Sequence, residues 1–85
     1  MNNELPLYVR IAIIKGVNRM MQNLDDELQK QPFSLEEARD VYAEIVGVMD
    51  YIRTQRGFNS YARLLERFEP LQQRYLALKE SLKTE

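Results

Sequence analysis

Apolar residues recur along the chain at alternating steps of three and four positions, in three separate segments. This spacing places them on one side of a helix with 3.6 residues per turn. The segments predict three amphipathic helices, over about residues 6–30, 35–56 and 60–83. None of them alternates apolar and polar residues in the way that is typical of a half-buried strand. The pattern therefore predicts an all-α protein.

The middle segment has the clearest boundaries. Ser34 and Glu37 have the spacing of a capping box, in which each side chain bonds a free backbone amide at the start of a helix. Gly57 provides a residue that tolerates the left-handed conformation in which many helices end. The apolar positions between these signals are Ala38, Val41, Tyr42, Ile45, Val48, Met49 and Ile52. We therefore interpret this segment as the central helix of the fold.

The two connections between the segments are only a few residues long. Pro32 ends the first helix, because the residue before a proline is pushed away from the helical conformation. Short connections make consecutive helices lie antiparallel. The predicted fold is a single domain over residues 1–85, an up-down-up antiparallel three-helix bundle.

The third segment contains Pro70 in the middle of a regular apolar stripe. A proline inside a helix removes one backbone hydrogen bond and presses on the carbonyl four residues earlier. The stripe keeps its phase on both sides of the proline, at Tyr61, Leu64, Phe68, Leu71, Tyr75, Leu78 and Leu82. We therefore predict one helix that is kinked near Pro70, with two shorter helices as the alternative.

The first segment has a wider apolar face than one partner helix would cover. Its main stripe consists of Leu7, Ile11, Ile14, Val17, Met21, Leu24 and Leu28. Val9, Ile13 and Met20 extend this face on one flank, to about 200° of the helix circumference. An exposed apolar strip is a usual mark of an interface. We therefore predict self-association, most simply as a homodimer, through this flank.

The composition excludes several kinds of chemistry. The chain has no cysteine and no histidine, which removes disulfides, zinc fingers, thiol nucleophiles and the commonest general base. Its three glycines are isolated, so they form no phosphate-binding loop. The carboxylates at 25–27 and 36–44 lack the spacing of a calcium-binding loop, and we expect them to be solvated. We expect a protein that is not an enzyme, with no cofactor and no metal.

The apolar run near the N-terminus, from Leu5 to Ile14, is interrupted by Arg10. It is also far shorter than a membrane span and lacks a preceding basic segment. We therefore expect a cytoplasmic protein that does not bind a membrane.

The charges are unevenly distributed, although the net charge is only −1. Acidic residues dominate the first half, whereas every basic residue from 53 to 74 is an arginine. Arg63, Arg67 and Arg74 share one stripe of the third predicted helix, and Arg56 lies just before it. Arginine binds carboxylates in a bidentate fork and is enriched at interfaces. These four residues predict a partner-binding surface, with a solvated helix face as the alternative.

Tyr51 is a further candidate contact, since it lies with Gly47 outside the apolar face of the middle segment. The start of the first segment, Leu7-Tyr8-Val9-Arg10, differs by the inserted Val9 from the Leu-Tyr-Arg motif of small three-helix mitochondrial adaptors. This motif therefore assigns no family to the chain.

Together these features predict a small non-catalytic protein–protein interaction module, such as an adaptor, an inhibitor or a chaperone-like factor. It would cover an acidic surface on a larger protein partner. Two alternatives stay open. One is nucleic-acid binding by the arginine stripe and the turn before it, which the acidic net charge opposes. The other is self-assembly through the acidic and basic ends of the bundle.

Overall fold

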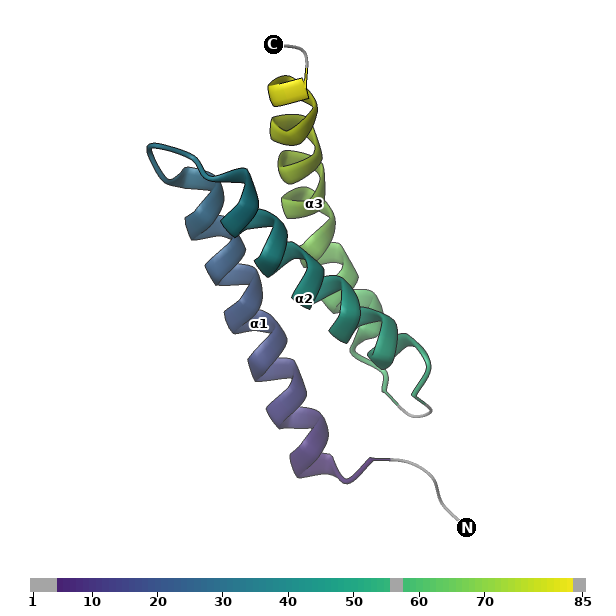
Figure 1. Cartoon of the computed structure of the whole chain (residues 1–85). Coiled ribbons are helices and arrows are strands. Elements are labelled where there is room, and N and C mark those ends of the chain that lie inside the picture. Colours follow the sequence, from purple (N-terminus) through teal and green to yellow (C-terminus); the bar gives the residue numbers. More distant parts are fainter. Residues whose placement is uncertain (1–4, 56–57, 84–85) are drawn as a thin grey trace.

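The structure, a computed structural model, describes residues 5–55 and 58–83. It consists of three helices, α1 (Leu7–Gln29), α2 (Leu35–Arg53) and α3 (Tyr61–Lys83). Each helix packs against both others and runs antiparallel to the one before it (Figure 1). The described residues include no strand. The predicted up-down-up three-helix bundle is therefore confirmed, as an elongated body of about 55 × 18 × 18 Å.

The observed helix ends agree closely with the predicted ones, except at the end of α2. This helix ends at Arg53 rather than near residue 56. Its last turn tightens, because the amides of Thr54 and Gln55 each bond the carbonyl three residues earlier, at 3.1 Å. The Thr54 hydroxyl also donates to the Tyr51 carbonyl, at 2.7 Å. Gly57, the predicted stop signal, lies outside the described residues.

The start of α2 has half of the predicted capping box. The Ser34 hydroxyl accepts a hydrogen bond from the Glu37 amide at 3.3 Å. In the described chain the Glu37 carboxylate does not return a bond to the Ser34 amide, but lies 3.8 Å from the Lys30 ammonium group. Lys30 also donates to Glu27 at 2.7 Å, so it links the end of α1 to the start of α2. Glu36 and Glu37 favour the positive end of the helix dipole.

The interior of the bundle is apolar. Among the described residues, no polar or charged residue is buried. The core consists of Val17, Met21, Leu24, Leu28, Ala38, Ile45, Met49, Ile52, Phe58, Leu64, Phe68 and Tyr75. All of these except Phe58 belong to the predicted stripes, so the phases of the three helices were predicted correctly. Phe58 comes from the connection before α3 and closes one end of the core.

Pro70 lies inside a continuous α3, so the alternative of two shorter helices is wrong. The rings of Phe68 and Tyr75 both stack on Tyr42 of α2, with centroids 5.6 Å and 4.3 Å from its ring. The side-chain amide of Gln72 donates to the Tyr42 hydroxyl at 2.9 Å. These contacts lie on both sides of Pro70. Tyr42 therefore holds the two halves of α3 against α2 where the helix lacks a backbone hydrogen bond.

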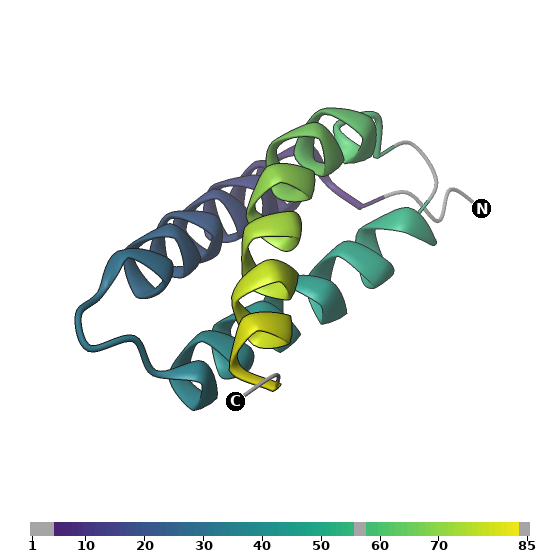
Figure 2. The ribbon, with the colours of Figure 1, turned by 90° about the horizontal axis from the view of Figure 1, so that it is seen from above.

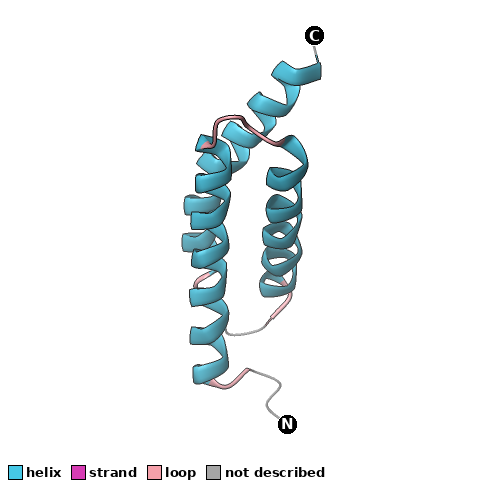
Figure 3. Cartoon of the chain, turned by 60° about the vertical axis from the view of Figure 1, so that its left-hand side comes forward, coloured by secondary structure: helices cyan, strands magenta, loops and turns pink. Residues whose placement is uncertain are grey.

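The direction of α3 changes along its length. Seen from above, α3 is inclined across the other two helices (Figure 2). Its C-terminal part leans outward and extends past the connection between α1 and α2 (Figure 3). Leu82, the last residue of the predicted apolar stripe, is therefore exposed.

We predict that Ser34→Ala lowers the free energy of unfolding by about 1 kcal/mol, because the Glu37 amide loses its hydrogen-bond acceptor at the helix start. Urea unfolding followed by circular dichroism measures this change. An unchanged midpoint would show that the cap does not form in solution.

We predict that Ile45→Ala and Phe68→Ala each cost about 2 to 5 kcal/mol, because both side chains are buried and their removal leaves a cavity. The same unfolding experiment measures both variants. Val46→Ala is the control, since Val46 is the exposed neighbour of Ile45 on α2. Equal losses at positions 45 and 46 would contradict the observed orientation of this helix.

Candidate functional site: the groove between α1 and α3

One side of α1 lines a shallow groove against α3. Six residues at alternating steps of four and three form this side: Leu7, Ile11, Ile14, Asn18, Met21 and Asp25. They line two hollows, one after the other along the helix. We call this surface the α1–α3 groove.

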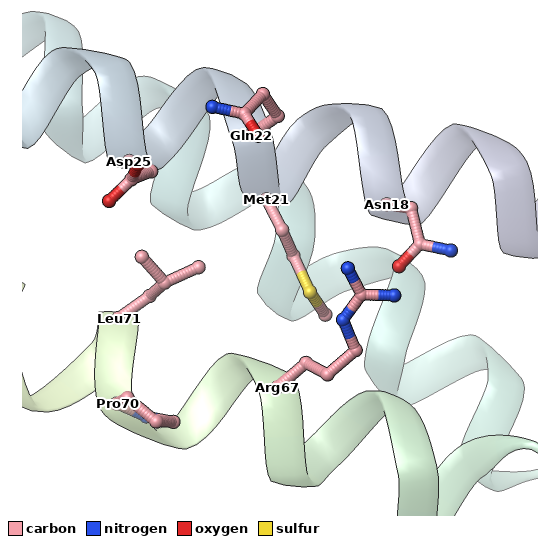
Figure 4. Close-up of a pocket in the computed structure, with 7 residues that line it drawn as sticks. All are labelled: Asn18, Met21, Gln22, Asp25, Arg67, Pro70 and Leu71. Atoms are coloured by element: carbon pink, nitrogen blue, oxygen red, sulfur yellow. The ribbon is translucent and has the colours of Figure 1, made fainter.

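The first hollow, of about 210 Å³, lies at the N-terminal end of α1. Its walls are the first turns of this helix and the segment Phe58-Asn59-Ser60 before α3. The second hollow, of about 290 Å³, lies further along, between Met21 of α1 and the Arg67, Pro70 and Leu71 side of α3. In this second hollow, Arg67 extends from α3 toward α1 and ends beside the side chains of Asn18 and Met21 (Figure 4).

The N-terminal end of α1 exposes large apolar side chains, of which Leu7 and Ile11 line the groove. Leu7, Tyr8 and Ile11 are 64%, 75% and 44% exposed. Leu7 and Ile11 begin the main apolar stripe predicted for this helix, but the bundle does not cover them as it covers the later residues of the stripe. The reason is length: the first turns of α1 extend past the connection between α2 and α3 (Figure 1), so no helix covers them.

The flank of α1 that was predicted to be exposed is instead partly buried. Val9, Ile13 and Met20 all have intermediate exposure, and Ile13 and Met20 pack against the core. The exposed apolar surface of α1 therefore belongs to the start of its main stripe and not to this flank. Self-association through Val9, Ile13 and Met20 stays a prediction, without the exposed strip on which it was based.

The predicted arginine stripe divides into a paired and an unpaired part. Arg74 donates to the Asp25 carboxylate of α1 at 2.6 Å, across the groove. Arg63 and Arg67 are exposed, and neither has an ion-pair partner within residues 5–55 and 58–83. Arg56 lies outside the described residues. Arg67 therefore lines the groove without an ion-pair partner in the described chain, and Arg63 lies one turn before it on α3, outside both hollows. Arg74 is already engaged.

The Asp25 carboxylate accepts two hydrogen bonds, one from Arg74 and one from the side-chain amide of Gln29 at 2.7 Å. Both bonds favour the ionised carboxylate, and the Arg74 charge adds to the effect. The pKa of Asp25 is therefore lower than its ordinary value.

Tyr51 is 46% exposed, as predicted from its place outside the apolar face of α2. It does not line the α1–α3 groove. The structure therefore does not bring Tyr51 into one site with the arginines.

A third hollow, of about 330 Å³, lies outside the groove, between α2 and α3, and includes Val46, Gly47 and Leu65. Its charged residues, Asp50 and Arg53, form an ion pair with each other at 2.6 Å. This surface is apolar but offers no unpaired charge. In contrast, the part of the α1–α3 groove that the structure describes combines exposed apolar side chains, at Leu7 and Ile11, with Arg67, which has no ion-pair partner there.

Carboxylates do not converge into a group that could hold a metal ion anywhere in the described parts of the chain. No described helix has both the length and the apolar character needed to cross a membrane. Comparison of the chain with known protein families, with curated proteins and with solved structures gives no match. The site is therefore interpreted from its own geometry.

Asn18 and Asp25 belong to the groove but were not predicted as site residues. A signal for them was present in the pattern. They occupy the same side of α1 as Leu7, Ile11 and Ile14, at steps of four and three. Polar residues at regular positions on an otherwise apolar side indicate that this side is not fully covered.

We predict that the pKa of the Asp25 carboxyl lies below 3.8 in the native protein and moves toward that value in Arg74→Gln. Because the folded-state pKa is lowered, the pair stabilises the fold above the ordinary pKa, and this contribution is lost as the pH falls through the lowered one. Side-chain NMR titration measures the pKa. An Asp25 pKa that is the same in both proteins would show that the ion pair does not persist in solution.

Proposed function

We propose that this chain is a non-catalytic helical interaction module that binds an acidic surface of a larger protein through the α1–α3 groove. One observation supports this proposal above the others. Exposed apolar side chains, at Leu7 and Ile11, line the same groove as Arg67, an arginine that has no ion-pair partner in the described chain.

The two kinds of group have different tasks in binding. Burial of a leucine or isoleucine side chain contributes about 1.5 to 3 kcal/mol when it is complete, so Leu7 and Ile11 can supply affinity. Arg63 and Arg67 can select an acidic partner and orient it, because charges across an interface act mainly on specificity and association rate. A groove with both is suited to a protein surface that has apolar groups with carboxylates beside them.

Nucleic-acid binding is less well supported by the same groups. Phosphate backbones attract clusters of unpaired cations. Arg74 is paired with Asp25, which leaves two arginines of the described stripe for phosphates. The exposed apolar side chains at the end of α1 have no counterpart on a duplex backbone.

We predict that a photo-crosslinking amino acid at Ile11, introduced into the full chain in its native host, forms an adduct with a larger protein. Arg63→Glu combined with Arg67→Glu should remove this adduct, because an acidic partner is then repelled. Leu76 of α3 is the matched control position, since it is 46% exposed and lies outside the groove, against 44% for Ile11. Mass spectrometry of the adducts identifies the partner.

Adducts that are identical from positions 11 and 76, or absent from position 11, would contradict the proposal. Fluorescence anisotropy with mixed-sequence DNA and RNA tests the alternative. Tight binding at physiological salt, with a log–log salt slope of about −0.9 per neutralised phosphate, would assign the arginines to nucleic acid if the charge reversal abolished it.

A further inference from the structure

We infer that the partner element in the α1–α3 groove is an acidic amphipathic α-helix, which lies along the groove as a fourth helix of the bundle. This inference rests on the proposed function and names the kind of structure that the partner presents. It follows from the shape of the groove, from the positions of its apolar hollows and from its charge.

The shape of the groove fits a helix. One wall is α1, and the other is α3 together with the segment Phe58-Asn59-Ser60 that leads into it. A rod between such walls gives the side-by-side packing of a four-helix bundle. An extended peptide would gain less binding free energy in this groove. Extended peptides bind mainly by adding a strand to a sheet edge, and the described chain contains no strand.

The two hollows set the positions of the anchoring side chains. Their midpoints along α1 are about three helical turns apart, or roughly 16 Å at 1.5 Å per residue. Ile11, Ile14 and Phe58 form the apolar part of the first hollow, and Met21 and Leu71 that of the second. A docked helix would therefore place large apolar side chains in two groups, about three turns apart on one face.

The charge of the groove sets the polar flank of the docked helix. Arg63 and Arg67 are one turn apart on α3, and Arg67 reaches into the second hollow (Figure 4). Beyond them Arg74 is neutralised by Asp25. Carboxylates are therefore favoured on the edge of the docked helix that faces the first half of α3, where they can bind both arginines in a bidentate manner.

A second copy of this chain fits the groove less well. In a two-fold symmetric dimer through this surface, the same patch of each subunit faces itself. Such a contact pairs residue i of one copy with residue j of the other, so each arginine would need a carboxylate elsewhere on the same patch. The described carboxylate of the groove, Asp25, is already engaged by Arg74 and is not available to the arginines of a second copy. Charge complementarity therefore favours a different protein over a second copy.

The test is a selection from a display library of random peptides, each about 20 residues long, a length that spans roughly 30 Å as a helix. The bait is the full wild-type chain. We expect enriched peptides to be acidic, to have two apolar groups on one helical face, to become helical on binding and to bind with one peptide per chain. Arg67→Glu and, independently, Ile11→Lys should each weaken this binding by about tenfold or more.

Arg39→Glu is the matched control, because Arg39 is an exposed arginine of α2 outside the groove and the substitution makes the same change of charge. It should leave the affinity unchanged. Circular dichroism of each variant checks that the fold is intact. Failure to enrich any peptide, enrichment of peptides without helical periodicity, or binding that neither groove variant weakens would overturn the inference.

Two further measurements separate this inference from its competitors. Binding of the wild-type chain to vesicles of anionic phospholipid, lost in Ile11→Lys, would assign the groove to a membrane surface and overturn the inference. Photo-crosslinking from Ile11 between two copies of the purified chain would overturn it in favour of self-docking. If the selection yields no helix while the Ile11 adduct in the host is still formed, the helix inference fails and the proposed function stands.

Discussion

The stacking of Tyr42 against both Phe68 and Tyr75 is the interaction on which the arrangement of α3 depends. Pro70 removes a backbone hydrogen bond from the middle of this helix and favours a kink there. The aromatic rings join α2 to α3 on each side of the proline, and Gln72 adds a hydrogen bond between them. The two helices are therefore held together along their aromatic side, while α3 meets α1 through the groove that Pro70 itself lines.

This arrangement leaves the α1–α3 groove of the bundle incompletely covered. The Asp25–Arg74 ion pair joins α1 to α3 at one end of the groove, but an exposed pair of this kind adds little stability. At the other end the first turns of α1 have no helix beside them, and their apolar side chains face solvent. A ligand that covered these side chains would also stabilise the fold, because anything that binds only the native state shifts the unfolding equilibrium.

The charge available to a partner depends on which arginines form ion pairs within the bundle. The sequence pattern did not distinguish Arg63, Arg67 and Arg74, which share one stripe of α3. The structure pairs Arg74 with α1 and leaves Arg63 and Arg67 without ion-pair partners in the described residues. The pair at Asp50 and Arg53 neutralises the other apolar hollow in the same way. Electrostatics thereby distinguish two hollows that are similar in size.

The sequence by itself determined the fold class and the phases of the helices, because apolar periodicity, proline positions and the Ser34 cap are local signals that act before any packing. It also placed Tyr51 outside the apolar face of the middle helix. Only the tertiary structure decided which apolar residues are covered. The exposure of Leu7 and Ile11, the partial burial of Ile13 and Met20 and the burial of Phe58 depend on where one helix ends beside another, and the pairing of Arg74 depends on a carboxylate 49 positions away in the chain. Apolar periodicity describes one helix at a time and does not specify how long the neighbouring helices are or how they are inclined. For this physical reason the α1–α3 groove could not be predicted from the pattern.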